Sequence, residues 1–358
     1  MPVEGTHSAP FRSLFMPGID EPTGTRSGLD TPFISVLIAA RNEENAILDC
    51  LRAIARLNYP PGKVEVLIGN DQSTDQTRTR VTEFITDKPT FHVVDITPSS
   101  IGLRGKANVL AQLVRQARGS LLFFTDADTR VPPDWLTEMS RQFNPPTGVV
   151  TGVTLPQGPG LFQKLQTIDW LYNLTLTHLV SIMGIPVTAM GNNMAVSRAG
   201  YEAVGGYEAL PFSVVEDYTL FQAIVANGYG FRNLLNEQVL AETTPVTTLG
   251  AFLQQRKRWM RGATALPAWM VGSLYVQYLI GPLLLLLGYF SPVLAAGLYL
   301  IRLFIQLTIL SFGLSRLKQT NLWLFALLFE PYQLIIGPLS VAFYLLPVPI
   351  EWKGRRYT

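Results

Sequence analysis

The sequence has little formal charge and only one cysteine. Charged side chains make up 15% of the 358 residues, against about 25% in an average soluble protein. The single cysteine, Cys50, excludes an internal disulfide, and its position in a helical pattern indicates packing rather than nucleophilic chemistry. The net charge is only +2 and no basic block with interleaved aromatic residues is present, which argues against nucleic-acid binding.

The shortage of charge is concentrated near the C-terminus. Residues 272–289 and 292–312 are apolar runs, and each is long enough to cross a bilayer, which takes about 20 residues. We therefore expect a membrane region of two to three segments over residues 266–350. Between residues 272 and 347 the formal charges are confined to Arg302, Arg316, Lys318 and Glu330.

A third apolar stretch, residues 322–346, contains Glu330 and Pro331 near its middle. An unpaired carboxylate is costly inside a bilayer, and proline interrupts the hydrogen bonds of a helix. Two arrangements therefore remain open. One is a third crossing, and the other is a re-entrant hairpin in which Glu330 pairs with Arg302 and the basic tail, residues 351–358, returns to the cytosol.

The N-terminal segment, residues 1–32, is rich in proline, glycine, serine and threonine and has no sustained periodicity. This composition predicts a flexible leader. The segment contains no apolar core of signal-peptide length, so we expect the region that follows to face the cytosol.

Strand-like and helical patterns alternate from residue 33 onwards. Apolar runs of strand length are separated by stretches in which apolar residues recur at helical spacing. Such alternation predicts a mostly parallel sheet with right-handed crossovers. The predicted strands are residues 33–40, 64–69, 91–96 and 120–125.

Polar residues follow three of these strands. The first strand ends in Arg41-Asn42-Glu43-Glu44, the second runs into residues 70–75, and the fourth is followed by Asp126 and Asp128. In open α/β sheets, ligands bind at the carboxyl ends of the strands, so a nucleotide is expected there. If the chain stays extended, Asp126 and Asp128 share one face and suit a hard divalent cation with phosphate ligands. A surface turn is the alternative.

The second half of this region departs from simple alternation. The long helix predicted for residues 161–183 has no clean polar face, and it suits a membrane interface and the core of a larger domain equally well. Glu216 and Asp217 begin an apolar helix, where the helix dipole alone also favours acidic residues.

A later helical stretch carries Gln255, Arg258 and Trp259 on one face. An arginine beside an amide and an indole suits a diphosphate and a sugar ring. A basic helix that snorkels at a membrane surface is the alternative interpretation.

These motifs together resemble family 2 glycosyltransferases, in order and over residues 33–262. The Gln-x-x-Arg-Trp pattern is similar to that of the membrane-bound members, and the tail at residues 352–357 resembles the ceramide-glucosyltransferase-like branch. The resemblance implies an α/β fold with a Rossmann-like, mostly parallel sheet (the A-type glycosyltransferase fold) followed by a C-terminal membrane helical region. The implied boundaries are a glycosyltransferase domain at residues 33–265 and the membrane region at residues 266–350.

The resemblance also implies roles for individual residues. Asp126 and Asp128 would hold Mg²⁺ or Mn²⁺, and Asp217 would be the base that deprotonates the acceptor. Arg258 and Trp259 would close over the diphosphate and the acceptor. The residues implied in nucleotide-sugar binding are Arg41, Glu43, Asp71, Lys106, Asp126 and Gln255.

The sequence thus predicts a metal-dependent, inverting glycosyltransferase that moves a sugar from a nucleotide-sugar, with UDP-sugar expected, to a lipid or lipid-linked hydroxyl at the bilayer. We expect a multi-pass membrane protein with a cytosolic catalytic domain, and leave its oligomeric state open. A small processive polysaccharide synthase is the alternative enzyme. A membrane transport protein with a nucleotide-sensing domain and an inactive scaffold are the alternatives that are not enzymes.

Overall fold

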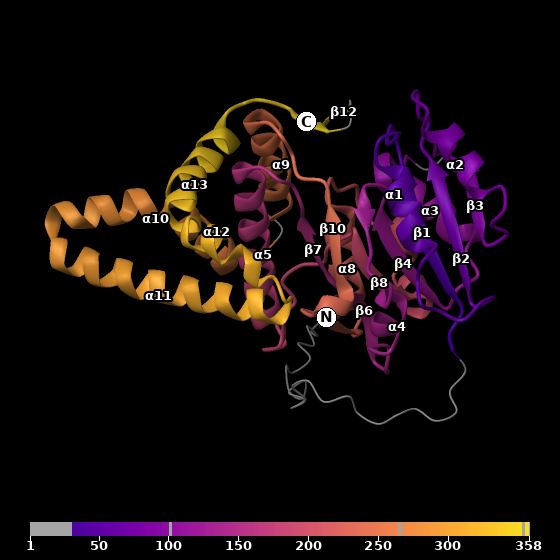
Figure 1. The fold of residues 1–358 in the computed structure, drawn as a ribbon, viewed down its shortest axis with the longest axis horizontal. Helices are drawn as coiled ribbons and strands as arrows, with labels where there is room; N and C mark the ends of the chain where they lie inside the picture. The colour runs from indigo at the N-terminus through magenta and orange to yellow at the C-terminus, as the bar shows by residue number, and fades with distance from the viewer. Residues whose placement is uncertain (1–30, 100–101, 264–265, 267, 353–354, 358) are drawn as a thin grey trace, which may run out of the picture.

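The computed structural model describes residues 31–99, 102–263, 266, 268–352 and 355–357. The predicted leader lies outside these residues except for its last two positions. Figure 1 shows an α/β domain on one side and a bundle of apolar helices on the other.

The described residues form a central sheet of seven strands in the order β3-β2-β1-β4-β8-β6-β9. The first four strands of this order are parallel, and β8 runs antiparallel to both β4 and β6. The predicted mostly parallel sheet is therefore confirmed, with β8 as the reversed strand. The strands are β1 (Ile34–Ala40), β2 (Val64–Asn70), β3 (Phe91–Asp95), β4 (Leu121–Asp126), β6 (Thr147–Thr151), β8 (Asn193–Ser197) and β9 (Gly230–Asn233).

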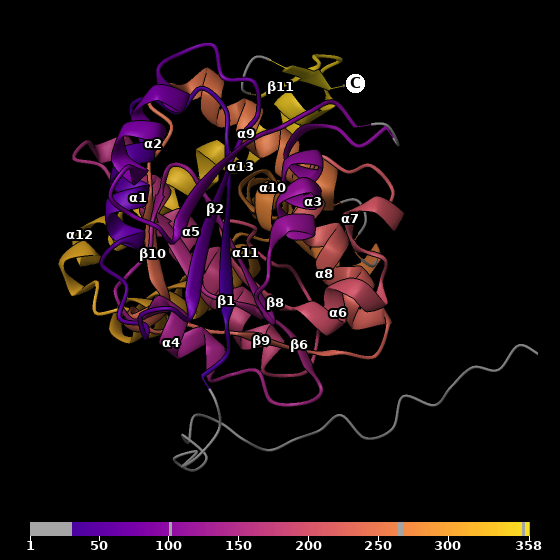
Figure 2. The same cartoon turned by 90° about the vertical axis from the view of Figure 1, so that its right-hand side faces the viewer.

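Helices cover both faces of the sheet, as Figure 2 shows with α1 and α2 on one side and α3 and α8 on the other. Successive residues of a strand point to opposite faces. In β4, Phe123 accordingly meets Trp135 on one face, with ring centroids 5.0 Å apart, and Phe124 meets Tyr207 on the other at 6.4 Å. The helices are α1 (Ile47–Ile54), α2 (Thr77–Ile85), α3 (Gly105–Gln116), α4 (Trp135–Ser140), α6 (Arg198–Ala203), α7 (Gly206–Ala209) and α8 (Glu216–Ala226).

A second sheet, of three strands in the described residues, lies beside the first: β5 (Thr129–Arg130), β10 (Leu240–Thr243) and β7 (Val153–Pro156). The buried side chain of Asn193 connects the two sheets. It accepts a hydrogen bond from Trp135 Nε1 at 2.8 Å and donates to the carbonyl oxygens of Val153 and Val239 at 2.9 Å each. These bonds satisfy both amide protons and the amide oxygen, and they fix β8 against the second sheet.

Helix α5 (Leu161–Ser181) is a core helix, one of the two interpretations that its sequence left open. Ile168 and Leu171 are buried in a cluster that includes Leu310 and Leu314 of helix α11 (Pro292–Arg316). The other side of α5 packs on β7. This third hydrophobic core joins the α/β domain to the apolar helices, so the lack of a polar face on α5 follows from burial on both sides.

Two described helices have the length and apolarity to cross a membrane, α10 (Ala268–Phe290) and α11. They form the hairpin that projects from the domain in Figure 1. A third crossing exists only if a bent pair of segments, residues 320–327 and α13 (Phe329–Leu345), counts as one span with a bend of 60°. The first of these segments contains helix α12 (Trp323–Leu327).

Both ends of this bent pair contact the α/β domain. Before α12, Lys318 Nζ lies 2.6 Å from Glu237 Oε1. After α13, Lys257 Nζ donates to the Leu346 carbonyl oxygen at 2.5 Å. Near the bend, Arg302 of α11 pairs with Glu330, so the predicted Arg302–Glu330 ion pair is confirmed.

The chain ends in a short hairpin of β11 (Ile350–Trp352) and β12 (Arg355–Tyr357). Strand β11 contacts helix α9 (Leu249–Ala263), which carries the Gln-x-x-Arg-Trp pattern. The segment after α13 therefore lies against the α/β domain.

Candidate active site

The register of the parallel strands brings the predicted polar residues to one edge of the sheet. Ala39 of β1 pairs with Asp126 of β4, and Ala40 pairs with Asn70 of β2. The residues that follow each strand end therefore lie side by side, as expected for the ligand edge of an α/β sheet.

Hydrogen bonds connect the loop after β1 to the loop after β2. Arg41 Nη1 donates to the Asp71 carbonyl oxygen at 2.7 Å, and the Glu43 amide donates to Thr77 Oγ1 at 2.7 Å. Asn42, at φ 52° in the left-handed region, accepts from the Thr74 amide at 2.9 Å. These two hydrogen-bonded loops thus hold three residues predicted to bind the nucleotide, Arg41, Glu43 and Asp71.

Asp126 ends β4 next to these two loops, and Asp128 lies in the turn that follows, so the chain does not stay extended between them. Burial and the neighbouring Asp126 carboxylate raise the pKa of Asp128 to about 6. Two crowded carboxylates of this kind fit a divalent cation, whose charge favours the ionised form of both. Among the described residues no group of three or more histidine, cysteine, aspartate or glutamate side chains is arranged for a metal. Asp126 and Asp128 alone would leave the other coordination positions of such a cation to substrate phosphates and water, which Mg²⁺ commonly binds.

Lys106, at the start of α3, lies between two carboxylates. Its Nζ is 2.5 Å from Asp126 Oδ1 and 3.5 Å from Glu216 Oε1. Burial alone would lower the pKa of Lys106, but Asp126 and Glu216 raise it above its usual range, so the lysine is a cation. A fixed cation at this edge suits a diphosphate.

Glu216 is a site residue to which the sequence assigned no role. Burial raises the pKa of its carboxyl, while the Lys106 ammonium opposes that shift. The signal available in the sequence was its position beside Asp217 at the start of a helix, which the helix dipole explains equally well.

The Asp217 carboxylate is held by two backbone amides. Oδ2 accepts from Gly191 at 2.6 Å and Oδ1 accepts from Tyr218 at 2.8 Å. A Cβ atom at position 191 would lie 2.6 Å from Oδ2, so only glycine leaves room for this contact. Gly191 is 26 positions from Asp217, and nothing in the local pattern indicates that the two meet.

Helix α9 presents its predicted residues in different directions. Arg258 is half-buried, and its positive charge opposes the burial that raises the pKa of the Glu216 carboxyl. One turn further along α9, a Cβ atom at Gly262 would lie 2.6 Å from Val215, the neighbour of Glu216, so this side of the helix faces the acidic residues. Trp259 instead packs edge-on against Trp170 of α5, with centroids 5.0 Å apart. Gln255 is half-buried, one turn before Arg258.

Cys50 lies beneath the acidic pair, where its Sγ donates to the Asp126 carbonyl oxygen at 3.4 Å. Burial, and then the charge of Asp128, raise the pKa of this thiol well above its usual range. A thiol that stays protonated is a poor nucleophile, which agrees with the packing role predicted for it.

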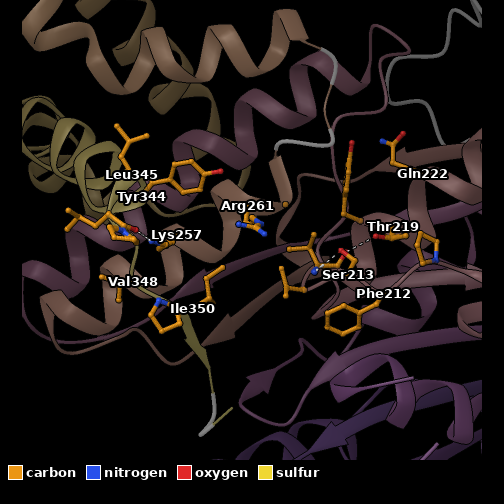
Figure 3. Close-up of a pocket in the computed structure, with 18 residues that line it drawn as sticks. Phe212, Ser213, Thr219, Gln222, Lys257, Arg261, Tyr344, Leu345, Val348 and Ile350 are labelled. Atoms are coloured by element: carbon orange, nitrogen blue, oxygen red, sulfur yellow. Dashed lines mark hydrogen bonds between the residues drawn. The ribbon is translucent and has the colours of Figure 1, made fainter. Parts of the chain in front are cut away.

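A cavity of about 820 Å³ lies between the start of α8, the end of α9 and the segment after α13 (Figure 3). Val215 and Tyr218, which flank the Glu216-Asp217 pair, line it on one side. Tyr344, Leu345 and residues 346–350 line it on the side of the apolar helices, and Lys257 and Arg261 of α9 lie between. The cavity thus extends from the residues on either side of the Glu216-Asp217 pair to the segment after α13.

Comparisons with known proteins agree with this architecture. Over 243 residues the chain is 28% identical to a beta-monoglucosyldiacylglycerol synthase from Synechocystis, a match that covers 67% of this chain and 50% of the relative. It is 28% identical over 233 residues to a poly-beta-1,6-N-acetyl-D-glucosamine synthase from Staphylococcus epidermidis, covering 64% of this chain and 54% of that one. The chain spans about half the length of the curated relatives it matches.

Among solved structures, the chain is similar to a mannosyltransferase from Pyrobaculum calidifontis in complex with GDP-Man and Mn²⁺. The TM-score is 0.55 at 20% identity, with 85% of this chain and 89% of that chain covered. This likeness supports the A-type glycosyltransferase fold. Residues 20–358 match the sequence profile of glycosyl transferase family 21, which is nearly the whole chain, and the chain belongs to this glycosyltransferase family.

Proposed function

We propose that the protein transfers a sugar from a nucleotide-sugar to a lipid hydroxyl at a membrane, with inversion at the anomeric carbon. The observation that carries this proposal is the acidic cluster of Asp126, Asp128, Glu216 and Asp217 around Lys106, at the ligand edge of the sheet and next to residues that line the cavity. A Mg²⁺ or Mn²⁺ ion held by Asp126 and Asp128 would offset charge on the departing diphosphate.

The roles of the protein side chains follow from their positions. The nucleoside would be held by Arg41, Glu43 and Asp71, in the hydrogen-bonded loops after β1 and β2. The diphosphate would face Lys106 and Arg258. Gln255 belongs to the same helix as Arg258, and we retain it as a candidate contact to the donor. Trp259 instead packs against Trp170 and the Arg256 guanidinium, so the predicted contact of Trp259 with the acceptor is not part of the proposed site.

Asp217 is the candidate base. Each of its carboxylate oxygens accepts one amide hydrogen bond and keeps a further lone pair, so the group is oriented yet still able to accept a proton. The acceptor hydroxyl would lose its proton to Asp217 as its oxygen attacks the anomeric carbon and the diphosphate leaves. A single displacement of this kind inverts the configuration.

The cavity supports a lipid acceptor. Its lining on the side of α13 is apolar, and that helix packs on α10, one of the two helices with the length to cross a membrane. A lipid could therefore enter the cavity along this apolar lining, with its polar headgroup near Lys257 and Arg261 and toward the Glu216–Asp217 pair. The relative from Synechocystis is named as a monoglucosyldiacylglycerol synthase, which agrees with a glycerolipid or similar acceptor.

The experiment is an assay of the purified protein in lipid vesicles. UDP-glucose, UDP-GlcNAc, UDP-galactose and GDP-mannose are each supplied with diacylglycerol or ceramide and with Mn²⁺ or Mg²⁺. We expect release of the nucleoside diphosphate that depends on both lipid and metal, and one glycolipid by mass spectrometry. Absence of release with every donor would contradict the proposal.

A processive polysaccharide synthase is the second candidate, because one relative is named as a poly-N-acetylglucosamine synthase. The two functions differ in the product, which is a lipid carrying one sugar in the first case and a polymer in the second. A transport protein or an inactive scaffold would release no nucleoside diphosphate. We also propose that the α/β domain faces the cytosol, where nucleotide-sugars are made.

A further inference from the structure

A buried ion pair on α9 has no part in the chemistry proposed above. Arg256 Nη2 donates to Asp169 Oδ2 of α5, and the two side chains are only 5% and 11% exposed. The rings of Phe252 and Trp259 each lie 4.8 Å from the Arg256 guanidinium carbon. The guanidinium is therefore enclosed by a carboxylate and two aromatic rings.

This ion pair also adjoins two apolar helices. Tyr278 of α10 and Tyr332 of α13 lie beside it and line the same small buried pocket. Asn173, one turn along α5, donates to Asp169 Oδ1 at 2.9 Å. Four helices thus meet at one charged pair, and because an unpaired charge is costly in such a place, they have little freedom to shift independently.

The pair lies on the side of α9 away from the acidic cluster. An α-helix turns by about 100° per residue, so Arg258 points roughly 200° around the axis from Arg256. Rotation of α9 would carry Arg258 away from Glu216 only if Arg256 also left Asp169. The Arg256–Asp169 contact on one side of α9 therefore restricts the position of Arg258 on the other side.

We propose that Asp169 and Arg256 are positioning residues that set the rotation of α9 and so hold Arg258 against the acidic cluster. This proposal rests on the function above, in which Arg258 acts at the donor site.

The test replaces both charged partners by apolar residues of similar size, Asp169→Leu with Arg256→Met. Removing both charges leaves neither one buried alone, so we expect the fold to be retained. The matched control is Arg302→Met with Glu330→Leu. That second buried ion pair joins α11 to α13, and neither partner is on α9.

The first measurement reports the orientation of α9 and does not depend on enzyme activity. Arg258→Cys is introduced into a Cys50→Ala protein, and its rate of reaction with a maleimide is compared between the native pair, the apolar pair and the control. We expect at least a threefold change with the apolar pair and none with the control. Equal rates in all three would overturn the proposal, whatever the activity of the protein.

The second measurement reads coupling by kinetics. With the native pair, Arg258→Ala should lower kcat at least tenfold. With the apolar pair kcat should already be at least tenfold lower, and adding Arg258→Ala should lower it less than threefold further, because coupled positions are not additive. Additive losses would contradict the positioning role. A wild-type protein inactive on all donors would instead contradict the proposed function.

If the apolar variant does not fold, Arg256→Lys replaces it. Lysine keeps the charge but lacks the planar group that contacts Asp169 and both rings. The rate of maleimide labelling in the Arg258→Cys background should then change at least twofold, and an unchanged rate would again overturn the proposal.

Discussion

The acidic residues of the site differ in what holds each carboxylate. Asp126 has the Lys106 ammonium at 2.5 Å, and Asp217 has two backbone amides. The Asp128 carboxyl is crowded by Asp126 and has a pKa raised to about 6. These environments agree with different proposed roles for carboxylates that the sequence alone does not distinguish.

Asp128→Ala should abolish transfer and leave the fold intact, because removal of a metal ligand loses several kcal/mol of transition-state stabilisation. The measurements are turnover in Mn²⁺ and the shift in melting temperature that Mn²⁺ and nucleoside diphosphate produce together. Asp87→Ala, at an exposed position, is the control. Near-normal turnover of Asp128→Ala would refute the metal assignment.

Asp217→Asn should lower kcat by about 10²–10⁴-fold, because the amide cannot accept the proton of the acceptor. The affinity for the nucleoside diphosphate, measured by titration calorimetry, should stay within about twofold, since the change keeps the shape of the side chain. A parallel loss of nucleotide binding would move Asp217 from the base role to the donor pocket.

Glu65 lies away from the site and makes an acid-sensitive contribution to stability. Its carboxylate accepts from Ser35 Oγ at 2.7 Å and from the Arg118 amide at 2.6 Å. Burial would raise the pKa of Glu65, but these hydrogen bonds and the Arg118 charge hold it below its usual value of 4.5. The stabilisation is therefore complete above that value and is lost as the pH falls through the lower, folded-state pKa.

Glu65→Gln should lower the free energy of unfolding by about 1.5–3 kcal/mol at neutral pH, the usual loss for a hydrogen bond to a charged group. Denaturant unfolding followed by tryptophan fluorescence, repeated at pH 7 and pH 3, measures it. The difference between variant and wild type should shrink at pH 3. Glu202→Gln, whose ion pair is largely exposed, should change stability by less than about 1 kcal/mol.

Among the larger elements, α9 places side chains in three different environments on three of its faces. Lys257 and Arg261 line the cavity, Arg258 joins the acidic cluster and Arg256 is buried against α5. The start of α8 similarly carries Asp217 beside the cavity residues Val215 and Tyr218. The proposed acceptor and donor sites therefore share these two helices.

Ser213→Phe fills part of the cavity with an aromatic ring. If lipid binds there, the KM for the lipid should rise at least tenfold while the KM for the nucleotide-sugar stays within about twofold. Both are measured with the lipid dispersed at varied surface concentration in mixed micelles. Thr86→Phe, on the exposed end of α2, should change neither value, and an unchanged lipid KM in Ser213→Phe would exclude this cavity as the acceptor site.

At the scale of the whole molecule, the contacts favour the re-entrant arrangement of α12 and α13. Lys318 and Leu346, at the two ends of the pair, both contact the α/β domain. The pair reaches Arg302, which is ten residues into α11 and so about 15 Å along it. That is half of the roughly 30 Å hydrocarbon core, so we propose that the pair enters to the middle of the bilayer and returns.

Cysteine labelling on intact cells tests this topology in a Cys50→Ala protein. Val293→Cys should react with a membrane-impermeant reagent, because the residue is 85% exposed and lies at the start of α11, where the projecting hairpin turns. Val348→Cys and Thr86→Cys should react only after permeabilisation. Reaction of Val348→Cys on intact cells, with Thr86→Cys still protected, would mean that the bent pair crosses the membrane.

Local patterns were sufficient to predict the four parallel strands β1 to β4, the ligand edge that they form and the apolar hairpin. Parallel strands joined by helices must bring their carboxyl ends to one edge, so residues following β1, β2 and β4 could be grouped without coordinates. Long uncharged runs likewise need no partner to be recognised. The Arg302–Glu330 pair was predictable because each is an isolated charge in an apolar stretch, and such charges pair with one another.

Features that depend on contacts between distant segments came from the folded chain alone. One of the two buried sides of α5 is covered by α11, which lies more than 100 positions further along the chain, and no local period encodes that contact. The contact of Gly191 with Asp217, the position of Glu216 beside Lys106 and the turn of Trp259 toward Trp170 are of the same kind. Periodicity reports which face of a helix is buried, but what that face meets is decided by the packing of the whole chain.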